Sequence, residues 1–354
     1  MSLEPLRKKI DSFDSKIVYM LNERAKLSKQ IGEAKLKDQI SIYSPAREKK
    51  VLNHLRTLNK GPISKEALEA IYREIMSSSL SLEKPLRIAS LGTQGSFTYI
   101  AARKKFGSQV EYVSCRNIPE VFQRVEQGDC DYGVAPVENS VEGAVTDTFD
   151  LLVDSELKIC SQVLQKISHY LLSKERSLKN IRKIHSNPQV FGQCRSWLSQ
   201  NLPKADLIME ASTTQAAEIA TKQKYSAAIA SREAGEIYNL NILEDNLQDI
   251  AHNTTRFLII AKGDAPATGK DRTTILFSIK DKMGALHAML SPFLQYKINL
   301  TKIESRPSKK KAWDYYFFVD FEGHRLDKNV MKALAKLEVM CKYLKVVGSY
   351  PVLE

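Results

Sequence analysis

The first forty residues carry hydrophobic or small side chains at spacings of three and four, which predicts one long amphipathic helix. These positions are Leu3, Leu6, Ile10, Phe13, Ile17, Met20, Leu27, Ile31 and Ala34. At about 1.5 Å per residue, a helix from Leu3 to Lys35 is about 48 Å long. A domain spanning residues 1–85 cannot bury such a helix by itself. We therefore expect a homodimer, or a higher homo-oligomer, in which two of these helices share a core.

Two shorter helices follow, and polar residues fall on the inward faces of all three. Ser44-Pro45 and Ser64 are typical of helix starts, and hydrophobic stripes follow each of them. The inward polar residues are Arg24, Lys35, Glu48, Ser79 and Glu83. The pattern predicts an all-α bundle with a basic pocket, which suits a small dicarboxylate.

Arg7 cannot reach this pocket from its own helix. Lys35 follows Arg24 by about three helical turns and points the same way, whereas Arg7 lies about 25 Å before Arg24 and is rotated by about 100°. An antiparallel helix of a second chain could bring its Arg7 to Arg24. The sequence therefore predicts a site shared between two chains.

The middle of the chain alternates short strands with helices, which predicts an α/β domain over residues 86–265 with two lobes around a cleft. Strand-like runs cover residues 86–91, 132–137, 159–172, 227–231 and 257–261. Clusters rich in hydroxyl and amide groups lie between them, at residues 92–98, 138–143, 212–214 and 253–257. Each cluster alone is more typical of a helix cap or a turn than of a site.

The tail is predicted to be a separate module over residues 272–354, after a linker at residues 265–270. Its pattern predicts strand, helix, two strands, helix and strand. This is the α+β order of a ferredoxin-like fold. The run of lysines at residues 309–311 is expected to lie on a solvated hairpin.

The net charge of +12 on 354 residues is concentrated in the helical region. Residues 1–85 hold 17 Lys and Arg against 11 Asp and Glu. A nucleic-acid surface and a pocket for a small polyanion compete as explanations, and the inward position of the basic residues favours the pocket. No stretch approaches 18 uncharged apolar residues, so we expect no membrane partner. Five widely spaced cysteines and the lack of an apolar leader predict a cytoplasmic protein.

No pair of histidines has metal-ligand spacing, and no phosphate-binding or dinucleotide fingerprint occurs, so neither a metal nor a cofactor is expected.

Residues 3–83 carry a dispersed set of motifs, namely Leu6-Arg7-Lys8-Lys9-Ile10-Asp11, Asp14, Glu23-Arg24, Gly32-Glu33-Ala34-Lys35 and Pro45-Ala46-Arg47-Glu48. These motifs give the region a resemblance to the all-helical chorismate mutase family. The resemblance implies an intertwined dimer that rearranges chorismate to prephenate. Arg24 and the partner's Arg7 would hold the two carboxylates, and Lys35 would touch a carboxylate and the ether oxygen.

The resemblance also implies that Arg47 and Glu48 line the pocket near the ring hydroxyl and that Ser79 lies at a carboxylate. Glu83 would donate to the ether oxygen, for which it has to carry a proton. The rearrangement needs no nucleophile or general base, because the protein has only to hold the reactive conformer and stabilise the charge on the ether oxygen.

Residues 86–262 carry several motifs in order: Gly92…Gly95-Ser96-Phe97, the run at 138–143, Pro188-Gln189…Gln193-Cys194, Ser212-Thr213-Thr214, the run at 230–234, and Thr255-Arg256-Phe257. With these motifs the region strongly resembles prephenate dehydratase, which has two lobes like those of periplasmic binding proteins. The implied reaction removes the ring hydroxyl and CO₂ from prephenate and gives phenylpyruvate, without a cofactor. Thr255 would donate to the leaving hydroxyl. Substrate oxygens would be bound by Asn139, Ser140, Ser212, Thr213 and Thr214.

Two residues of these motifs have open roles. Arg256 is counted among the substrate-binding residues, where it either orients Thr255 or only bridges the lobes. Glu142 is either a polar wall or a second proton source.

The tail resembles the phenylalanine-sensing ACT domain, on Asp281-Lys282-Met283-Gly284-Ala285-Leu286 and Glu304-Ser305-Arg306-Pro307. The first run opens a helix whose free N–H groups can meet a carboxylate. Glu304, Ser305 and Arg306 would complete the site across an interface between two ACT domains. The resemblance implies feedback inhibition by phenylalanine, relieved by removing residues 272–354.

Three other readings stay open. The chain could be a monofunctional dehydratase whose helical domain only dimerises, a two-lobed ligand sensor without catalysis, or, more remotely, a basic nucleic-acid binder.

Overall fold

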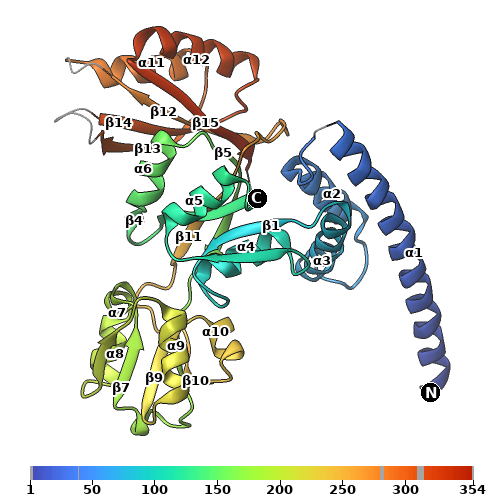
Figure 1. Cartoon of the computed structure of the whole chain (residues 1–354), viewed down its shortest axis with the longest axis vertical. Helices are drawn as coiled ribbons and strands as arrows, with labels where there is room; N and C mark the ends of the chain where they lie inside the picture. The colour runs from blue at the N-terminus through green and yellow to red at the C-terminus, as the bar shows by residue number, and fades with distance from the viewer. Residues whose placement is uncertain (1–2, 39, 280–282, 309–314, 353–354) are drawn as a thin grey trace. The chain divides into compact units, whose positions relative to one another are not determined.

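The computed structural model describes residues 3–38, 40–279, 283–308 and 315–352 (Figure 1). The lysine run at 309–311 and the motif residues Asp281 and Lys282 lie outside these ranges. The described chain divides into two compact units. One is residues 1–87 together with 105–111, and the other is residues 88–104 with 112–354.

The first unit contains the three predicted helices. They are α1 (Glu4–Lys37), α2 (Pro45–Leu58) and α3 (Lys65–Glu83). The Ser44 and Ser64 side chains accept the N–H groups of Arg47 and Ala67, so both predicted N-caps are confirmed.

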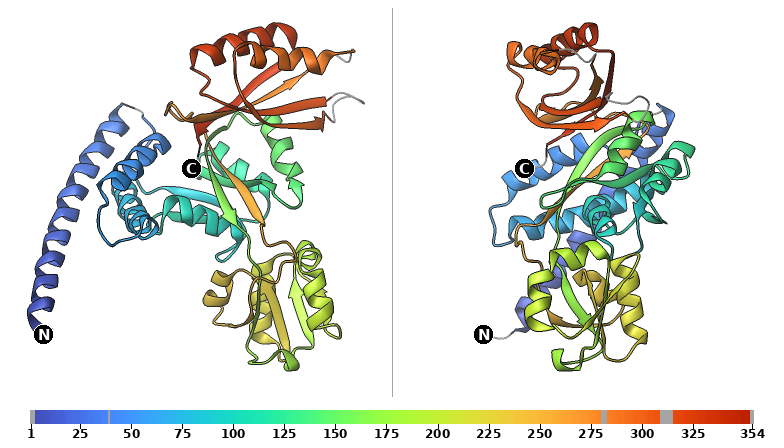
Figure 2. Two further views of the ribbon diagram at one scale, coloured as in Figure 1. Left: turned by 180° about the vertical axis from the view of Figure 1, so that it is seen from behind. Right: turned by 90° about the vertical axis from the view of Figure 1, so that its left-hand side faces the viewer.

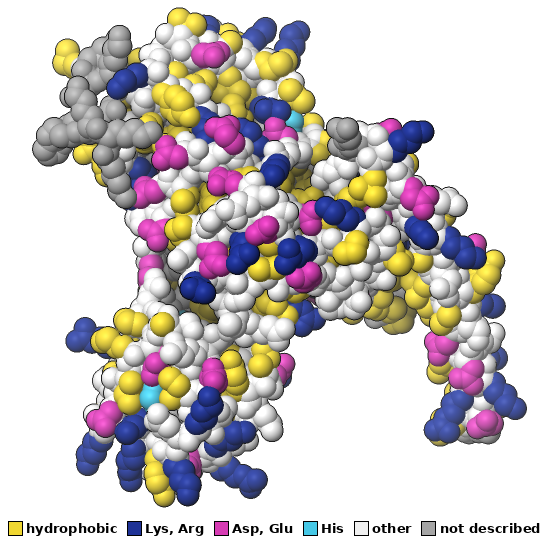
Figure 3. Space-filling view, viewed as in Figure 1, with side chains coloured by type: hydrophobic (Ala, Val, Ile, Leu, Met, Phe, Trp, Pro, Cys, Tyr) yellow, Lys and Arg dark blue, Asp and Glu magenta, His cyan; other side chains and the backbone are white. Residues whose placement is uncertain are grey.

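The hydrophobic stripe of α1 lies in solvent over most of its length. Among its described residues, α1 buries Ser28 and Gly32, both in its C-terminal half. Phe13, Ile17 and Met20 are 62%, 54% and 63% exposed. Hydrophobic side chains are visible along this helix in Figure 3. An exposed stripe of this length indicates an interaction surface.

The second unit contains two α/β lobes. The first lobe has a mixed sheet of order β2-β1-β3-β11-β5, with β4 paired to β3. Its elements are β1 (Arg87–Leu91), α4 (Phe97–Phe106), β2 (Glu111–Cys115), α5 (Ile118–Gln127), β3 (Tyr132–Asn139), β4 (Gly143–Ala144), α6 (Thr146–Asp154), β5 (Lys158–Lys166) and β11 (Thr254–Ala261).

The second lobe is an insertion between β5 and β11, with a sheet of order β10-β6-β9-β7-β8. Its elements are β6 (Tyr170–Ser173), a 3₁₀ turn (Leu178–Asn180), β7 (Lys183–Ser186), α7 (Pro188–Gln193), α8 (Arg195–Asn201), β8 (Asp206–Met209), α9 (Thr213–Lys222), β9 (Ser226–Ala230), α10 (Arg232–Ile237) and β10 (Asn241–Glu244). The predicted single run at 159–172 is therefore wrong as one strand. The run contains two strands in different lobes, β5 and β6, and the segment that connects them includes His169.

The tail has the predicted ferredoxin-like order. Its elements are β12 (Asp271–Ser278), α11 (Ala285–Gln295), β13 (Leu300–Pro307), β14 (Tyr315–Glu322), α12 (Lys328–Met340) and β15 (Tyr343–Pro351). The sheet order is β13-β14-β12-β15, and α11 and α12 cover one face (Figure 2). The other face packs on the first lobe, where Phe318 meets Phe149 with ring centroids 4.8 Å apart.

Candidate active sites

Four of the predicted helical-site residues meet where α1 passes α3. Lys35 Nζ lies 2.7 Å from Glu83 Oε2 and donates to the carbonyl oxygen of Ile42 at 2.7 Å. Arg24 Nη1 donates to Ser79 Oγ, and Ser79 Oγ donates to the carbonyl of Ile75. Two cations and two polar partners thus lie along one helix contact, as a site for an anion requires.

Gly32 makes this close approach possible. A Cβ atom at this position would lie 2.7 Å from Glu83 Cα and 2.8 Å from Glu83 Cβ. The glycine lies one helical turn before Lys35, so it sets the spacing between α1 and α3 at the pair that Lys35 forms with Glu83.

The structure does not bring the other three predicted residues to this pair within one chain. Arg7 lies in the exposed first half of α1, and the Arg47 side chain is exposed at the start of α2. Glu48 accepts from Tyr43 Oη at 2.8 Å and pairs with Lys105 Nζ at 2.8 Å. Lys105 belongs to the segment at 105–111 that packs with the helices, which is outside the region the sequence predicted for this unit.

Thr255 and Asn139 form one rung of the ladder between β11 and β3. Their Cα atoms are partners in the antiparallel register, and Asn139 Nδ2 donates to Thr255 Oγ1 at 2.9 Å. The side chain of Thr255 is buried, with 9% of the residue exposed. Thr255 therefore accepts from Asn139, and its own proton has no acceptor within the described part of the chain. Such a hydroxyl is oriented to donate to a ligand.

A polar network continues from this rung into the second lobe. Asn139 Nδ2 also donates to Asn253 Oδ1 at 2.7 Å, and Asn253 Nδ2 donates to Gln193 Oε1 at 3.1 Å. Gln193 Oε1 lies 2.7 Å from His169 Nε2, and Gln193 Nε2 donates to Glu142 Oε1. Burial lowers the pKa of His169, against the opposing effect of its hydrogen bond with Gln193. The neutral ring therefore donates through Nε2.

The prediction missed His169, Gln193 and Asn253 as members of the site. Gln193 and Asn253 lie inside motifs that the sequence singled out, so their residue types were a usable signal. His169 gave no such signal, because it follows a strand whose end the hydrophobic pattern placed too late.

The remaining predicted dehydratase residues lie beside Asn139 and at the start of α9. Ser140 Oγ donates to the carbonyl of His252 at 3.0 Å and accepts from Thr254 N. Ser212 caps α9, and its Oγ lies 3.1 Å from Thr214 Oγ1, which also accepts from Thr93. Thr213 is the first residue of α9 and is partly exposed.

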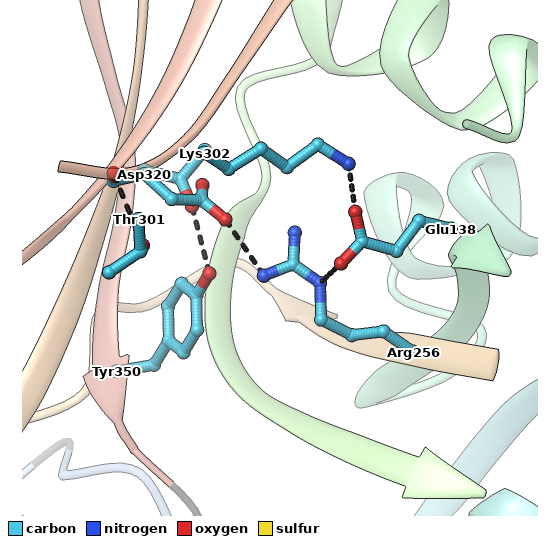
Figure 4. Close-up of polar contacts among 7 residues, drawn as sticks. Glu138, Arg256, Thr301, Lys302, Asp320 and Tyr350 are labelled. Carbon is cyan, nitrogen blue, oxygen red and sulfur yellow. Dashed lines mark hydrogen bonds and ion pairs between the residues drawn. The ribbon is translucent and has the colours of Figure 1, made fainter. Parts of the chain in front are cut away.

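Arg256 lies on the other face of β11 from this network, and its predicted role in substrate binding stays a prediction. Residues next to each other on a strand point to opposite faces, so Arg256 turns away from the face of Thr255. Its Nε lies 3.0 Å from Glu138 Oε1 and its Nη1 lies 2.7 Å from Asp320 Oδ2 (Figure 4). Asp320 belongs to β14 of the tail, so Arg256 bridges the first lobe and the tail.

The predicted regulatory residues do not gather around one point in a single chain. Gly284, with φ of 75°, is the N-cap of α11, ahead of the buried Ala285 and the partly exposed Leu286. On β13, Glu304 and Arg306 share the face that packs on the first lobe, and Ser305 lies on the opposite face. Arg306 Nη2 pairs with Asp150 Oδ1 of α6 at 3.4 Å.

Within the described residues, no group of three His, Cys, Asp or Glu side chains could hold a metal ion. None of the described helices is long and apolar enough to span a membrane.

Comparison with known proteins gives the same order of parts. Residues 6–84 match the model of chorismate mutase type II, residues 88–265 that of prephenate dehydratase, and residues 273–339 that of the ACT domain. The bifunctional chorismate mutase/prephenate dehydratase of Aquifex aeolicus is 48% identical over 99% of this chain and 98% of its own. The chain belongs to the bifunctional chorismate mutase/prephenate dehydratase family.

Other relatives extend this match. The bifunctional enzyme of Escherichia coli is 30% identical over 98% of this chain and 95% of its own. The structure of a prephenate dehydratase from Arthrobacter aurescens in complex with L-Phe is 32% identical. It covers 75% of this chain and 90% of its own, with a TM-score of 0.70. This enzyme thus carries a helical mutase domain, a two-lobed dehydratase domain and an ACT domain.

Proposed function

We propose that the chain rearranges chorismate to prephenate at the helical site and converts prephenate to phenylpyruvate in the two-lobed domain. Phenylalanine inhibits the second step by binding to the ACT domain. The enzyme works in the cytoplasm, which agrees with five cysteines that are all free thiols.

The mutase step relies on Arg24, Lys35, Ser79 and Glu83, with Arg7 supplied by a second copy of the chain. Chorismate carries two carboxylates, and its reactive conformer brings the bond-forming carbons together while the ether C–O bond breaks. Arg24 and the partner's Arg7 fix the carboxylates. Lys35 stabilises the negative charge that develops on the ether oxygen, in place of its contact with Glu83.

The exposed stripe of α1 supports the homodimer that this site needs. Leu6, Ile10 and Phe13 are 48%, 57% and 62% exposed in one chain. Within one chain, Arg7 lies about 25 Å along the helix from Arg24. A second α1 in the antiparallel direction would cover the stripe and place its own Arg7 beside Arg24.

The dehydratase step relies on Thr255 as proton donor. The carboxylate carbon of prephenate leaves as CO₂, and the electron pair of the broken C–C bond enters the ring. The ring C–O bond breaks, and the leaving hydroxide takes a proton from Thr255 to become water. Thr255 then recovers its proton from solvent. Asn139 orients the threonine, while Asn253, Gln193 and Glu142 surround it with polar groups.

The observation that carries this assignment is the hydrogen bond from Asn139 to Thr255, because it leaves the threonine proton for the substrate. Thr255→Ala is expected to lower dehydratase kcat by roughly 10²–10⁴-fold. Thr254→Ala is the matched control, since the neighbouring side chain points to the other face and its loss is expected to have little effect. Chorismate is supplied to each protein, and prephenate and phenylpyruvate are both followed.

Three outcomes separate the alternatives. Normal kcat in Thr255→Ala would place the proton donor elsewhere, with Glu142 next. A wild-type chain that forms phenylpyruvate from prephenate but leaves chorismate unchanged would be a monofunctional dehydratase. A chain that forms neither product would be a ligand sensor.

A further inference from the structure

The ladder between β3 and β11 joins the dehydratase site to the ACT sheet. Asn139 pairs with Thr255 on one rung, and Glu138 pairs with Arg256 on the next. Successive residues alternate between the two faces of a sheet, so the first rung faces the polar network and the second faces the ACT domain. A shift of the second rung therefore moves the first through a shared backbone.

A cross-strand pair of the ACT sheet contacts the pair of Glu138 and Arg256. Lys302 of β13 and Asp320 of β14 are partners in the antiparallel register. Lys302 Nζ pairs with Glu138 Oε2, Glu138 Oε1 pairs with Arg256 Nε at 3.0 Å, and Arg256 Nη1 pairs with Asp320 at 2.7 Å (Figure 4). Two cations and two anions thus form a chain of ion pairs between the sheets.

Arg256 and Asp320 of this cluster are buried, whereas Lys302 and Glu138 are partly exposed. The side chains of Arg256 and Asp320 are 6% and 4% exposed, and those of Lys302 and Glu138 are 19% and 31% exposed. Burial opposes the charge of Arg256, but the electrostatic effects of Tyr350, Asp320 and Glu138 outweigh this, so its pKa is raised. Charges held in such a place keep their partners, because separating them leaves a charge without compensation.

Asp320 is fixed from its own domain as well. Thr274 Oγ1 donates to Asp320 Oδ1 at 2.6 Å and lies 2.8 Å from Tyr350 Oη. A carboxylate only accepts, so the threonine proton points to Asp320 and Tyr350 donates to Thr274. Burial raises the pKa of Tyr350 and keeps it as a donor. Three strands of the ACT sheet therefore hold the carboxylate that binds Arg256.

We propose that Lys302 and Asp320 of the ACT domain are positioning residues for the dehydratase step, which hold Thr255 and Asn139 in place through Arg256 and Glu138. This inference rests on the proposed role of Thr255 as proton donor. The ACT domain would then affect dehydratase kcat directly, because an ACT rearrangement that breaks these ion pairs displaces the pair of Asn139 and Thr255, which carries the catalytic hydroxyl.

The test uses the full chain and compares two lysines that both join the first lobe to the ACT domain. Lys302→Met removes one of the two cationic partners of Glu138 and leaves Arg256 as the other. Lys158→Met is the matched control, because Lys158 Nζ donates to the carbonyl of Val346 at 3.1 Å and sits opposite Ala261, far along the ladder from Thr255.

Lys302→Met is expected to lower dehydratase kcat about 2- to 30-fold with KM for prephenate near its wild-type value. Lys302→Arg keeps the charge and is expected to restore most of kcat. Lys158→Met is expected to keep kcat. Asp320→Asn, which preserves shape, provides a second test from the other end of the cluster and is expected to lower kcat in the same way. Mutase activity in each sample reports an intact helical unit, and a KM for prephenate near the wild-type value reports an intact dehydratase site.

Wild-type kcat in both Lys302→Met and Asp320→Asn would overturn the inference, as would an equal loss in Lys158→Met. Thr255→Ala, assayed in parallel, distinguishes a wrong positioning role for Lys302 from a wrong proton-donor role for Thr255. If it is inactive while Lys302→Met is normal, the positioning role alone is wrong. If it is active, the proposed proton donor is wrong.

Discussion

Gly32→Ala is a small and local perturbation of the mutase site, because it adds one methyl group where α1 and α3 are in contact. The added Cβ would lie 2.7 Å from Glu83 Cα and 2.8 Å from Glu83 Cβ. Carbon atoms in contact prefer about 3.5–4.0 Å, so the two helices would have to separate by roughly 1 Å. The obstructing atoms belong to a backbone and to the first side-chain carbon, and neither can rotate away.

Two effects oppose each other in the stability of this variant. Alanine favours a helix interior over glycine by about 1 kcal/mol. Overpacking a tight contact costs about 1–3 kcal/mol. We expect the clash to win, so that the free energy of unfolding of the helical unit falls by up to about 2 kcal/mol.

The loss of mutase activity should be larger than the loss of stability. The clash is at Glu83 itself and one turn from Lys35, and a misplacement of about 1 Å can cost about 10²-fold in rate. The assay measures mutase kcat/KM and dehydratase kcat in one sample, together with the melting curve. Gly61→Ala is the matched control, since a Cβ there meets no described atom within 4 Å. Wild-type mutase activity together with a raised melting temperature in Gly32→Ala would refute this account of the site.

Three further predictions concern the partner chain, acidity and feedback. Arg7→Ala and Arg24→Ala are each expected to abolish most mutase activity and to regain part of it when mixed; no recovery in subunits that demonstrably exchange would exclude the shared site. Burial lowers the pKa of His169 from 6.5. Below about pH 6.5, His169 therefore binds a proton more readily in the unfolded chain than in the folded chain. Stability is therefore expected to fall on acidification, and His169→Asn should weaken that dependence in melting curves recorded between pH 5 and 8. Gly284→Val is expected to weaken phenylalanine inhibition and phenylalanine binding measured by calorimetry, whereas Gly269→Val, at another glycine with positive φ, should change neither; equal binding by the two variants would count against the site at Gly284.

Local chemistry made much of the fold predictable. The N-caps at Ser44 and Ser64 and the three helices follow from short-range pattern and capping. So does the βαββαβ order of the tail. The meeting of Arg24, Lys35, Ser79 and Glu83 also followed from helical periodicity, because a helix fixes the direction of each side chain to within a fraction of a turn.

Long-range register was not predictable in the same way. Knowing that Thr255 and Arg256 are neighbours does not reveal which face of the strand lies toward the second lobe and which toward the tail. The pairing of Arg256 with Asp320 crosses 64 positions of the sequence, and the pairing of Glu138 with Lys302 crosses 164. Only the folded sheets bring these residues together, so the contacts of Arg256 and Glu138 with the tail could not be predicted from the sequence.

The ACT domain is also less separable than the linker at residues 265–270 suggests. Phe318 and Tyr350 belong to the same hydrophobic cluster as Phe149 of the first lobe. A Cβ atom at Gly348 of β15 would lie 2.2 Å from the carbonyl oxygen of Ile159 in β5, so the two backbones are in direct contact. A chain that ends at residue 265 would expose this core, and its loss of inhibition would not distinguish a missing sensor from a damaged dehydratase. Point variants such as Gly284→Val therefore test feedback better than removal of residues 272–354. Since the two domains share one core, we expect a change in ACT packing to reach the first lobe, and the ion pair between Arg256 and Asp320 joins the ACT sheet directly to β11.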